Sequence, residues 1–158
     1  LSQINADLFS QEGNINTLKG IQGVMVTVEE LGADIKSEGL SKTQIQTDVE
    51  LKLRTSGMKI LSFDEWLKTS GSPHLYVYAH VMKGKNSIEG IFIYNIEVGL
   101  KQGVALVRKP NITLLTDTWN AVGEIGYAGK KVMSETIRNT IKDKVDEFVN
   151  AWLAANQE

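Results

Sequence analysis

The sequence predicts an α/β fold of the α+β two-layer sandwich type, with two main helices on one face of a mixed, mostly antiparallel sheet of about five strands. Three observations predict it. The 158 residues and 42% hydrophobic content match one ordinary domain with a continuous core. Several segments alternate apolar and polar residues, as half-buried strands do. Two others repeat apolar residues at helical spacing. The predicted order is β-α-β-β-β-β-α.

The first part of the chain is expected to lead into the domain. Residues 1–19 are mostly polar, which predicts a partly ordered N-terminal lead-in, so the single domain is placed at residues 20–158. Over residues 21–31, Val24, Val26 and Val28 alternate with polar or exposed-type residues. This alternation predicts the first strand.

A helix is predicted from Ser41. Ser41 and Gln44 have the spacing of a capping box, in which side chains satisfy free backbone donors at the helix start. Ile45, Val49 and Leu53 recur every four residues and therefore share one face. Gly57 is expected to end this helix in the left-handed backbone conformation.

The middle of the chain predicts further strands. Residues 58–63 read as a short strand, parallel to the first because the helix forms the connection. Residues 64–68 predict a helical turn. Residues 75–82 alternate most clearly, with an aliphatic face and a face of tyrosine and histidine.

Two long strands are expected to complete an antiparallel meander. Residues 91–107 predict one strand with a bulge near a glycine, at Gly99 or Gly103, and residues 112–122 predict the next. Residues 123–129, with glycine at every third position, predict a flexible connector. A closing helix of about five turns is expected from Ser134, with an apolar stripe of Ile137, Ile141, Val145, Phe148, Val149 and Trp152.

Composition argues against several functions. The 17 basic and 19 acidic residues are nearly balanced, which disfavours nucleic acid as the main partner. Cysteine is absent, so thiol nucleophiles, disulfides and zinc-thiolate sites are excluded. No run of apolar residues is long enough to predict a transmembrane segment.

Histidine and glycine patterns also argue against metal and cofactor sites. His74 and His80 are six positions apart on one predicted strand, about 20 Å, too far to share a metal ion. Both are therefore expected at the solvated surface. The spacing Gly123-x-x-Gly126-x-x-Gly129 lacks the pattern of a phosphate-binding loop. The sequence thus predicts no metal site and no cofactor.

The sheet face that the helices leave uncovered is the predicted binding surface. Tyrosine and tryptophan expose apolar area with a polar tip and are frequent at interfaces. A solvent-exposed sheet face would carry the same residue types without a partner, so the surface is a hypothesis. The predicted partner is a protein or a small ligand, and a homodimer through an edge strand is a second option. The candidate binding residues are Tyr76, Tyr78, His80, Glu97, Asp117 and Trp119.

The same face carries an alternative function, a carboxylate-dependent hydrolase. Paired carboxylates can act as acid and base on a glycosidic bond. Glu29, Glu97 and Asp117 are the residues that could converge there.

Four stretches of the sequence carry a family resemblance: Leu18-Lys-Gly-Ile-Gln-Gly-Val24, Gln44-Ile-Gln-Thr-Asp-Val-Glu-Leu-Lys-Leu-Arg54, Glu65-Trp-Leu67 and Val145-Asp-Glu-Phe-Val-Asn-Ala-Trp-Leu153. Together they resemble a family of exported bacterial proteins of uncharacterised function. The resemblance spans nearly the whole chain, carries no catalytic motif, and implies a periplasmic or secreted protein. A chain that begins at Leu1 also fits removal of a signal peptide. The order of elements is similar to that of small periplasmic accessory domains, such as those of the Tol translocation protein and the curli-secretion lipoprotein, which work by binding partners.

Overall fold

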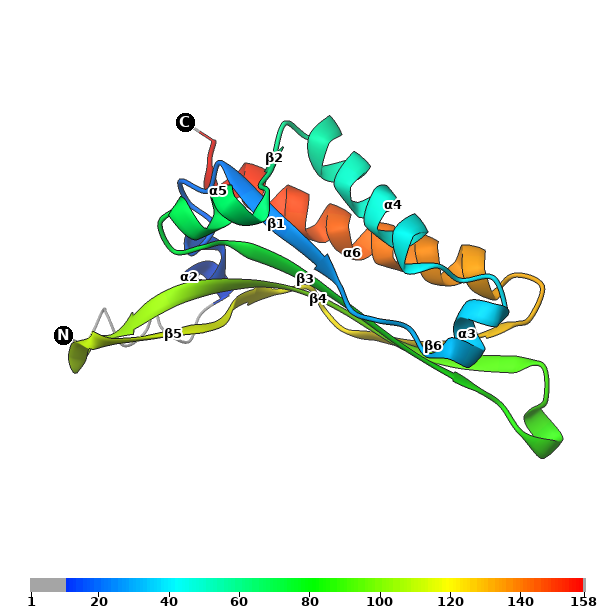
Figure 1. Ribbon diagram of the computed structural model, residues 1–158. Helices are drawn as coiled ribbons and strands as arrows, with labels where there is room; N and C mark the ends of the chain where they lie inside the picture. Colours follow the sequence, from blue (N-terminus) through cyan, green and yellow to red (C-terminus); the bar gives the residue numbers. More distant parts are fainter. Residues whose placement is uncertain (1–10, 158) are drawn as a thin grey trace.

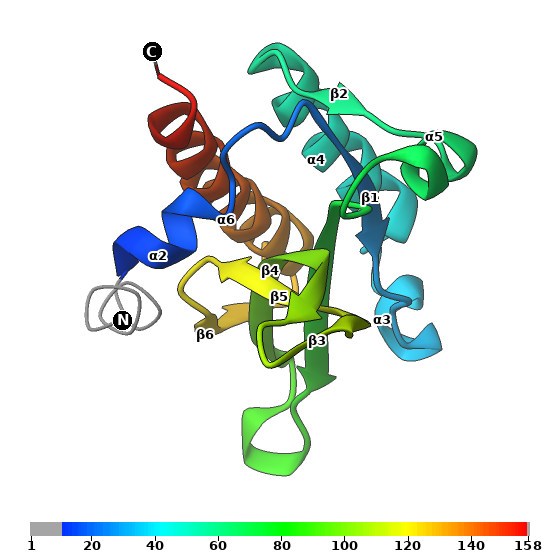
Figure 2. The same ribbon diagram turned by 90° about the vertical axis from the view of Figure 1, so that its left-hand side faces the viewer.

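Helices α4 and α6 pack side by side over one face of a mixed sheet, which confirms the predicted two-layer arrangement (Figures 1 and 2). The computed structural model describes residues 11–157. In chain order the elements are α2 (Gln11–Asn16), β1 (Gly23–Val28), α3 (Ala33–Ser37), α4 (Lys42–Thr55), β2 (Lys59–Ile60), α5 (Phe63–Lys68), β3 (His74–Lys83), a 3-10 turn (Asn86–Ile88), β4 (Ile91–Leu106), β5 (Lys109–Asn120), β6 (Glu124–Gly129) and α6 (Met133–Ala155).

The sheet follows the predicted topology, with one strand more than expected. Its order is β2-β1-β3-β4-β5, and β6 also pairs with β4. β1 is parallel to both β2 and β3, whereas β3, β4 and β5 form the predicted antiparallel meander. β4 is long enough to pair with β6 along its first half and with β5 along its second half.

The prediction of a flexible glycine-rich connector is wrong, because residues 124–129 form strand β6. Ile91–Ile96 of β4 pair with this strand in a regular antiparallel register. Gly126 permits the pairing: a Cβ atom there would lie 2.4 Å from Tyr94 Oη, so only glycine leaves room for the tyrosine across the strand. The two glycines at 126 and 129 hide the alternation of Ile125 and Tyr127, which is the strand signal in the sequence.

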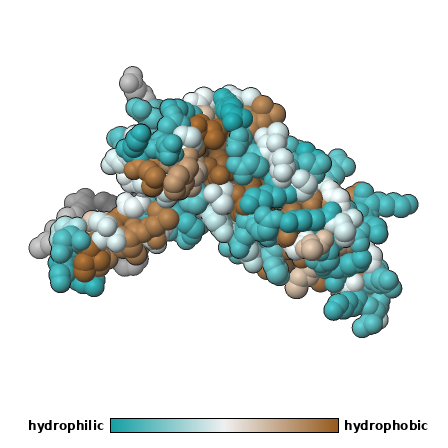
Figure 3. Space-filling view, in the orientation of Figure 1, coloured by the Kyte–Doolittle hydropathy of each residue, from teal (hydrophilic) through white to brown (hydrophobic). Residues whose placement is uncertain are grey.

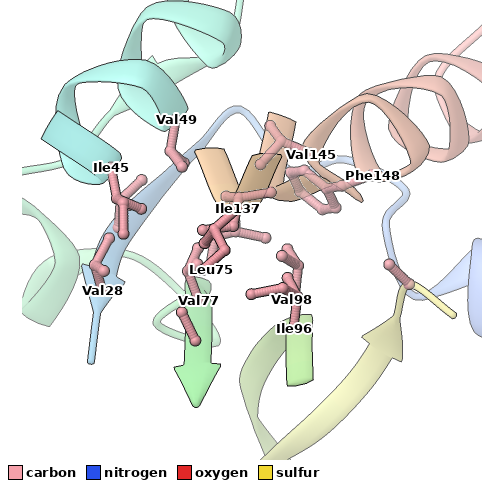
Figure 4. Packing of buried hydrophobic residues seen from close by; sticks show 14 of the residues in the cluster. Val28, Ile45, Val49, Leu75, Val77, Ile96, Val98, Ile137, Val145 and Phe148 are labelled. Carbon is pink, nitrogen blue, oxygen red and sulfur yellow. The ribbon is translucent and has the colours of Figure 1, made fainter. Parts of the chain in front are cut away.

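The two long helices begin and bury their apolar stripes as predicted. Ser41 Oγ accepts a hydrogen bond from the Gln44 amide (3.3 Å), and Gly57 ends α4 with φ of +89°. α6 has 23 residues and is longer than expected. Figure 4 shows how valine, leucine and isoleucine side chains from the sheet meet α4 and α6, with Phe148 among them.

Part of the predicted N-terminal lead-in lies within the described residues. The part at residues 1–10 lies outside the described residues, but α2 follows it and contacts α6 and β5. Leu18 is fully buried in the core. Near the other end of the chain, the Trp152 indole donates a hydrogen bond to the Ile21 carbonyl (2.8 Å), as expected for a residue at a helix seam. α2 and Leu18 therefore pack against the rest of the domain.

Candidate functional site

The aromatic residues Tyr76, Tyr78 and His80 lie in a row along β3, on the sheet face opposite α4 and α6. The alternation of β3 buries Leu75, Val77 and Ala79 and turns the even-numbered residues to the open face. Tyr78 and His80 stack in parallel, with ring centroids 6.1 Å apart. These three residues therefore lie on the uncovered sheet face, where their alternation in the sequence predicts them.

A pocket of about 250 Å³ opens on this face, and we call it the open-face pocket. Three neighbouring strands, β3, β4 and β5, supply its walls. It brings together four of the six predicted binding residues, namely Tyr76, Tyr78, Glu97 and Asp117, and His80 lies beside it against Tyr78. Its lining consists of Tyr76, Tyr78, Glu97, Gly99, Lys101, Asp117 and Asn120.

The absence of a side chain at Gly99 creates space for the side chains around the open-face pocket. Gly99 pairs with Tyr76 on one side and with Asn120 on the other. A Cβ atom at this position would lie 2.3 Å from Asn120 Oδ1 and 3.2 Å from Asp117 Oδ1. Glycine thus lets both polar side chains lie over the main chain of β4.

A bulge in β5 contradicts the prediction that Trp119 belongs to the binding surface. Leu100 pairs with Trp119 but Lys101 pairs with Asp117, so Thr118 is an extra residue in β5. Regular alternation would place Asp117 and Trp119 on the same face, and the extra residue separates them. Asp117 faces the pocket, whereas Trp119 is 7% exposed and packs edge-on against Phe148 of α6.

The open-face pocket contains a charged network. Lys101 Nζ donates to both carboxylate oxygens of Asp117 at 2.9 Å and lies 5.4 Å from the centre of the Tyr76 ring. The Tyr76 hydroxyl donates to Glu29 Oε2 (2.9 Å), and this bond to a carboxylate raises the pKa of Tyr76. Glu97 accepts a hydrogen bond from the Asn95 side chain (2.8 Å).

His74 is not the solvated surface residue that the sequence predicts. Trp66 of α5 and Tyr76 both contact its ring edge-on, with centroids 5.9 and 5.8 Å away. Both ring nitrogens are buried without a hydrogen-bond partner in the described structure. Burial, followed by the nearby charge of Lys101, lowers the pKa of His74. His80 is exposed, as predicted.

An exposed apolar patch adjoins the open-face pocket. Met82 and Ile93 are register partners one same-face position beyond His80 and Asn95. Ile125 and Tyr127 of β6 pair with Asn95 and Ile93, and are 78% and 77% exposed. We call Met82, Ile93, Ile125 and Tyr127 the apolar patch. Exposed apolar clusters are frequent at interaction surfaces.

A larger cavity lies elsewhere. It measures about 710 Å³ and lies between α3 and the turn that joins β3 to β4. The end of β3 and the turn that follows it supply most of its lining, and no aromatic side chain is among the lining residues. Because aromatic side chains and polar groups from three strands converge at the smaller open-face pocket, we place the candidate site there.

Lys101, Gly99 and Asn120 are pocket residues that the predicted site did not include. Lys101 and Gly99 are in phase with Glu97 along β4, so alternation alone could have indicated them. Asn120 reaches the pocket only because of the β5 bulge, which leaves no sign in the alternation pattern.

Within residues 11–157, no group of three or more metal-ligating side chains gathers, and no helix is long and apolar enough to cross a membrane. No protein-family model matches the sequence, and a search of curated proteins gave no significant match. The resemblance to exported bacterial proteins therefore stays a prediction from the residues.

Proposed function

We propose that the chain is a non-enzymatic binding or assembly module that holds a protein or small ligand on its open sheet face. The observation that carries this proposal is the open-face pocket. Aromatic and charged side chains from three strands converge there over a glycine, beside an exposed apolar patch. Interfaces combine the same components, namely aromatic anchors, a few fixed polar groups and apolar surface.

The contacts of the three carboxylates favour binding over hydrolysis. A hydrolase needs one carboxyl group that stays protonated in a desolvated setting so that it can act as an acid. Glu97 and Asp117 are exposed to solvent, and Asp117 also forms an ion pair with Lys101. Glu29 accepts a hydrogen bond from the Tyr76 hydroxyl. Such carboxylates are suited to holding a ligand.

Capture experiments with matched variants test this proposal. The purified chain and its Tyr78→Ala variant are used to capture partners from extracts of the source cells, with bound proteins identified by mass spectrometry. We expect Tyr78→Ala to lose the partners, because it removes one pocket wall. Asn139→Ala, at an exposed position of α6, is the control and should retain them. Equal capture by all three proteins would exclude the open face as the binding surface.

Two further parts of the proposal concern location and self-association. The resemblance to exported proteins supports a periplasmic or secreted location, which cell fractionation with an antibody tests.

A homodimer through an edge strand is supported by β5, where residues 111–116 carry no charge and Ile112, Leu114 and Leu115 are exposed. Figure 3 shows this hydrophobic surface on the projecting β4–β5 hairpin. Sedimentation of the purified chain over a range of concentrations measures the association.

A further inference from the structure

The open-face pocket already holds one cation, supplied by the chain itself. Lys101 Nζ lies 2.9 Å from both oxygens of Asp117 and 5.4 Å from the centre of the Tyr76 ring. An aromatic face carries negative quadrupole charge and therefore attracts a cation, as does a carboxylate. Lys101 thus indicates which chemical group these walls stabilise.

A second pair of the same kind lines the pocket without a cation. Tyr78 and Glu97 are direct register partners on β3 and β4. The Glu97 carboxylate accepts a hydrogen bond from Asn95, and no Lys, Arg or His within residues 11–157 forms an ion pair with it. The Glu97 carboxylate and the part of the Tyr78 ring that lines the pocket, away from His80, are therefore available to a cation from outside the chain.

The charges around the pocket also select for a cation. Its lining has two carboxylates and one ammonium group, which leaves one negative charge in excess. Glu29, held by the Tyr76 hydroxyl, adds another negative charge nearby. An anionic ligand would be repelled, because like charges at this range disfavour binding.

We propose, on the basis of the proposed function, that the open-face pocket takes a lysine or arginine side chain of a partner polypeptide. The ammonium or guanidinium group lies against Tyr78 and Glu97, as the Lys101 ammonium lies against Tyr76 and Asp117. Apolar residues about four positions from that basic side chain pack on the apolar patch, which on β3 and β4 begins two same-face positions farther along, beyond His80 and Asn95. Same-face positions are about 7 Å apart, the spacing of alternate residues in an extended peptide. This match favours a polypeptide over a free amine.

Peptide selection tests the inference with defined probes. Random 12-residue peptides displayed on phage are selected on the immobilised full chain, and the most enriched peptide is synthesised. A second copy has its lysine replaced by norleucine, or its arginine by citrulline, to remove the charge. We expect enriched peptides to carry a basic residue with apolar residues about four positions from it. We expect Kd to rise about tenfold or more for the neutral copy, and likewise for the charged peptide with Glu97→Gln.

Control variants separate this inference from the proposed function. Asp64→Asn removes an exposed carboxylate on α5 outside the pocket and should leave Kd unchanged. Circular dichroism confirms that each variant is folded. Peptides without a basic residue, a Kd that Glu97→Gln does not change, or no enrichment over an uncoated surface would overturn the cation inference. If the selected peptides bind the wild type but not Tyr78→Ala, the proposed function stands. If they bind both equally, it fails as well.

Discussion

Thr118 determines which side chains reach the open-face pocket, because it is the extra residue of the β5 bulge. Its hydroxyl donates to the Leu100 carbonyl (3.3 Å) and accepts from the Gln102 side chain (2.8 Å). Its carbonyl accepts from the Thr17 hydroxyl (3.1 Å). These bonds satisfy the polar groups that a bulge leaves without ladder partners. The bulge therefore fixes Asp117 on one face and Trp119 on the other.

Trp119→Ala tests this assignment at the level of single residues. Because the indole is buried against Phe148, its removal is expected to reduce the free energy of unfolding by about 3–5 kcal/mol. Tyr78→Ala, on the open face, is the matched comparison and should cost about 0.5–1 kcal/mol. Urea unfolding followed by circular dichroism measures both. Similar small losses for the two variants would contradict the burial of Trp119.

The sequence predicts individual residues well where one local pattern decides their environment. The valines of β1 and the stripe of α4 lie in the core because their spacing alone selects one face. Trp119 and His74 differ from prediction because distant segments decide their environment. The bulge beside Trp119 depends on Thr17 and Gln102, and α5 places Trp66 over His74. Such tertiary contacts have no signature in the alternation of a single strand.

Among the elements, α5 has the most complete cap. The Ser62 hydroxyl accepts from the Glu65 amide (3.3 Å), and the Glu65 carboxylate accepts from the Ser62 amide (2.9 Å). The carboxylate also binds Lys59 (2.6 Å). The bond to Lys59 has the largest effect and the bonds to Ser62 add to it, and together they lower the pKa of Glu65 to about 2. The helix that carries Trp66 onto His74 is therefore held by a charge-dependent contact.

Acid should loosen α5 before it disturbs the strands. The folded-state pKa of Glu65 lies below its ordinary value of 4.5, so the stabilisation is fully present above about pH 4.5 and is lost as the pH falls towards about 2. The Trp66 indole, which donates to the Ser72 carbonyl (2.7 Å), reports on this helix by NMR. We expect its signal to shift in that pH window in the wild type. Glu65→Gln should not show this shift, and identical titrations of the two proteins would contradict the prediction.

The strands differ in how far their sequences indicated them. β3 was predicted almost to the residue because its two faces differ in chemistry along ten residues. β2 has only two residues, since its pairing with β1 ends where the chain turns into α5. The sequence does not indicate β6, because glycines interrupt its alternation and its pairing depends on the unusual length of β4. Pairing partners far apart in sequence are what local patterns leave undetermined.

For the molecule as a whole, the two layers were predictable and the function was not. The layers follow from two apolar helix stripes and a sheet with one aliphatic face, and Asp48 with Arg138 adds a two-bond ion pair between α4 and α6 (2.7 and 3.0 Å). The open-face pocket, in contrast, needs a bulge, a glycine and side chains from three strands to coincide. The sequence indicated the correct face, and the fold placed four of the six candidate residues around one pocket.

The contact between the two ends of the domain has a consequence for chain connectivity. Gly20 donates to Asn156 Oδ1 (2.7 Å), and Asn156 Nδ2 donates to the Leu18 carbonyl (3.1 Å). Because these positions adjoin, the domain should tolerate circular permutation. A permutant that joins residue 157 to residue 11 through about ten Gly and Ser residues, which span up to about 33 Å, and opens the chain between Lys85 and Asn86 should keep the native NMR spectrum. Opening the chain inside β4, between Glu97 and Val98, should prevent folding.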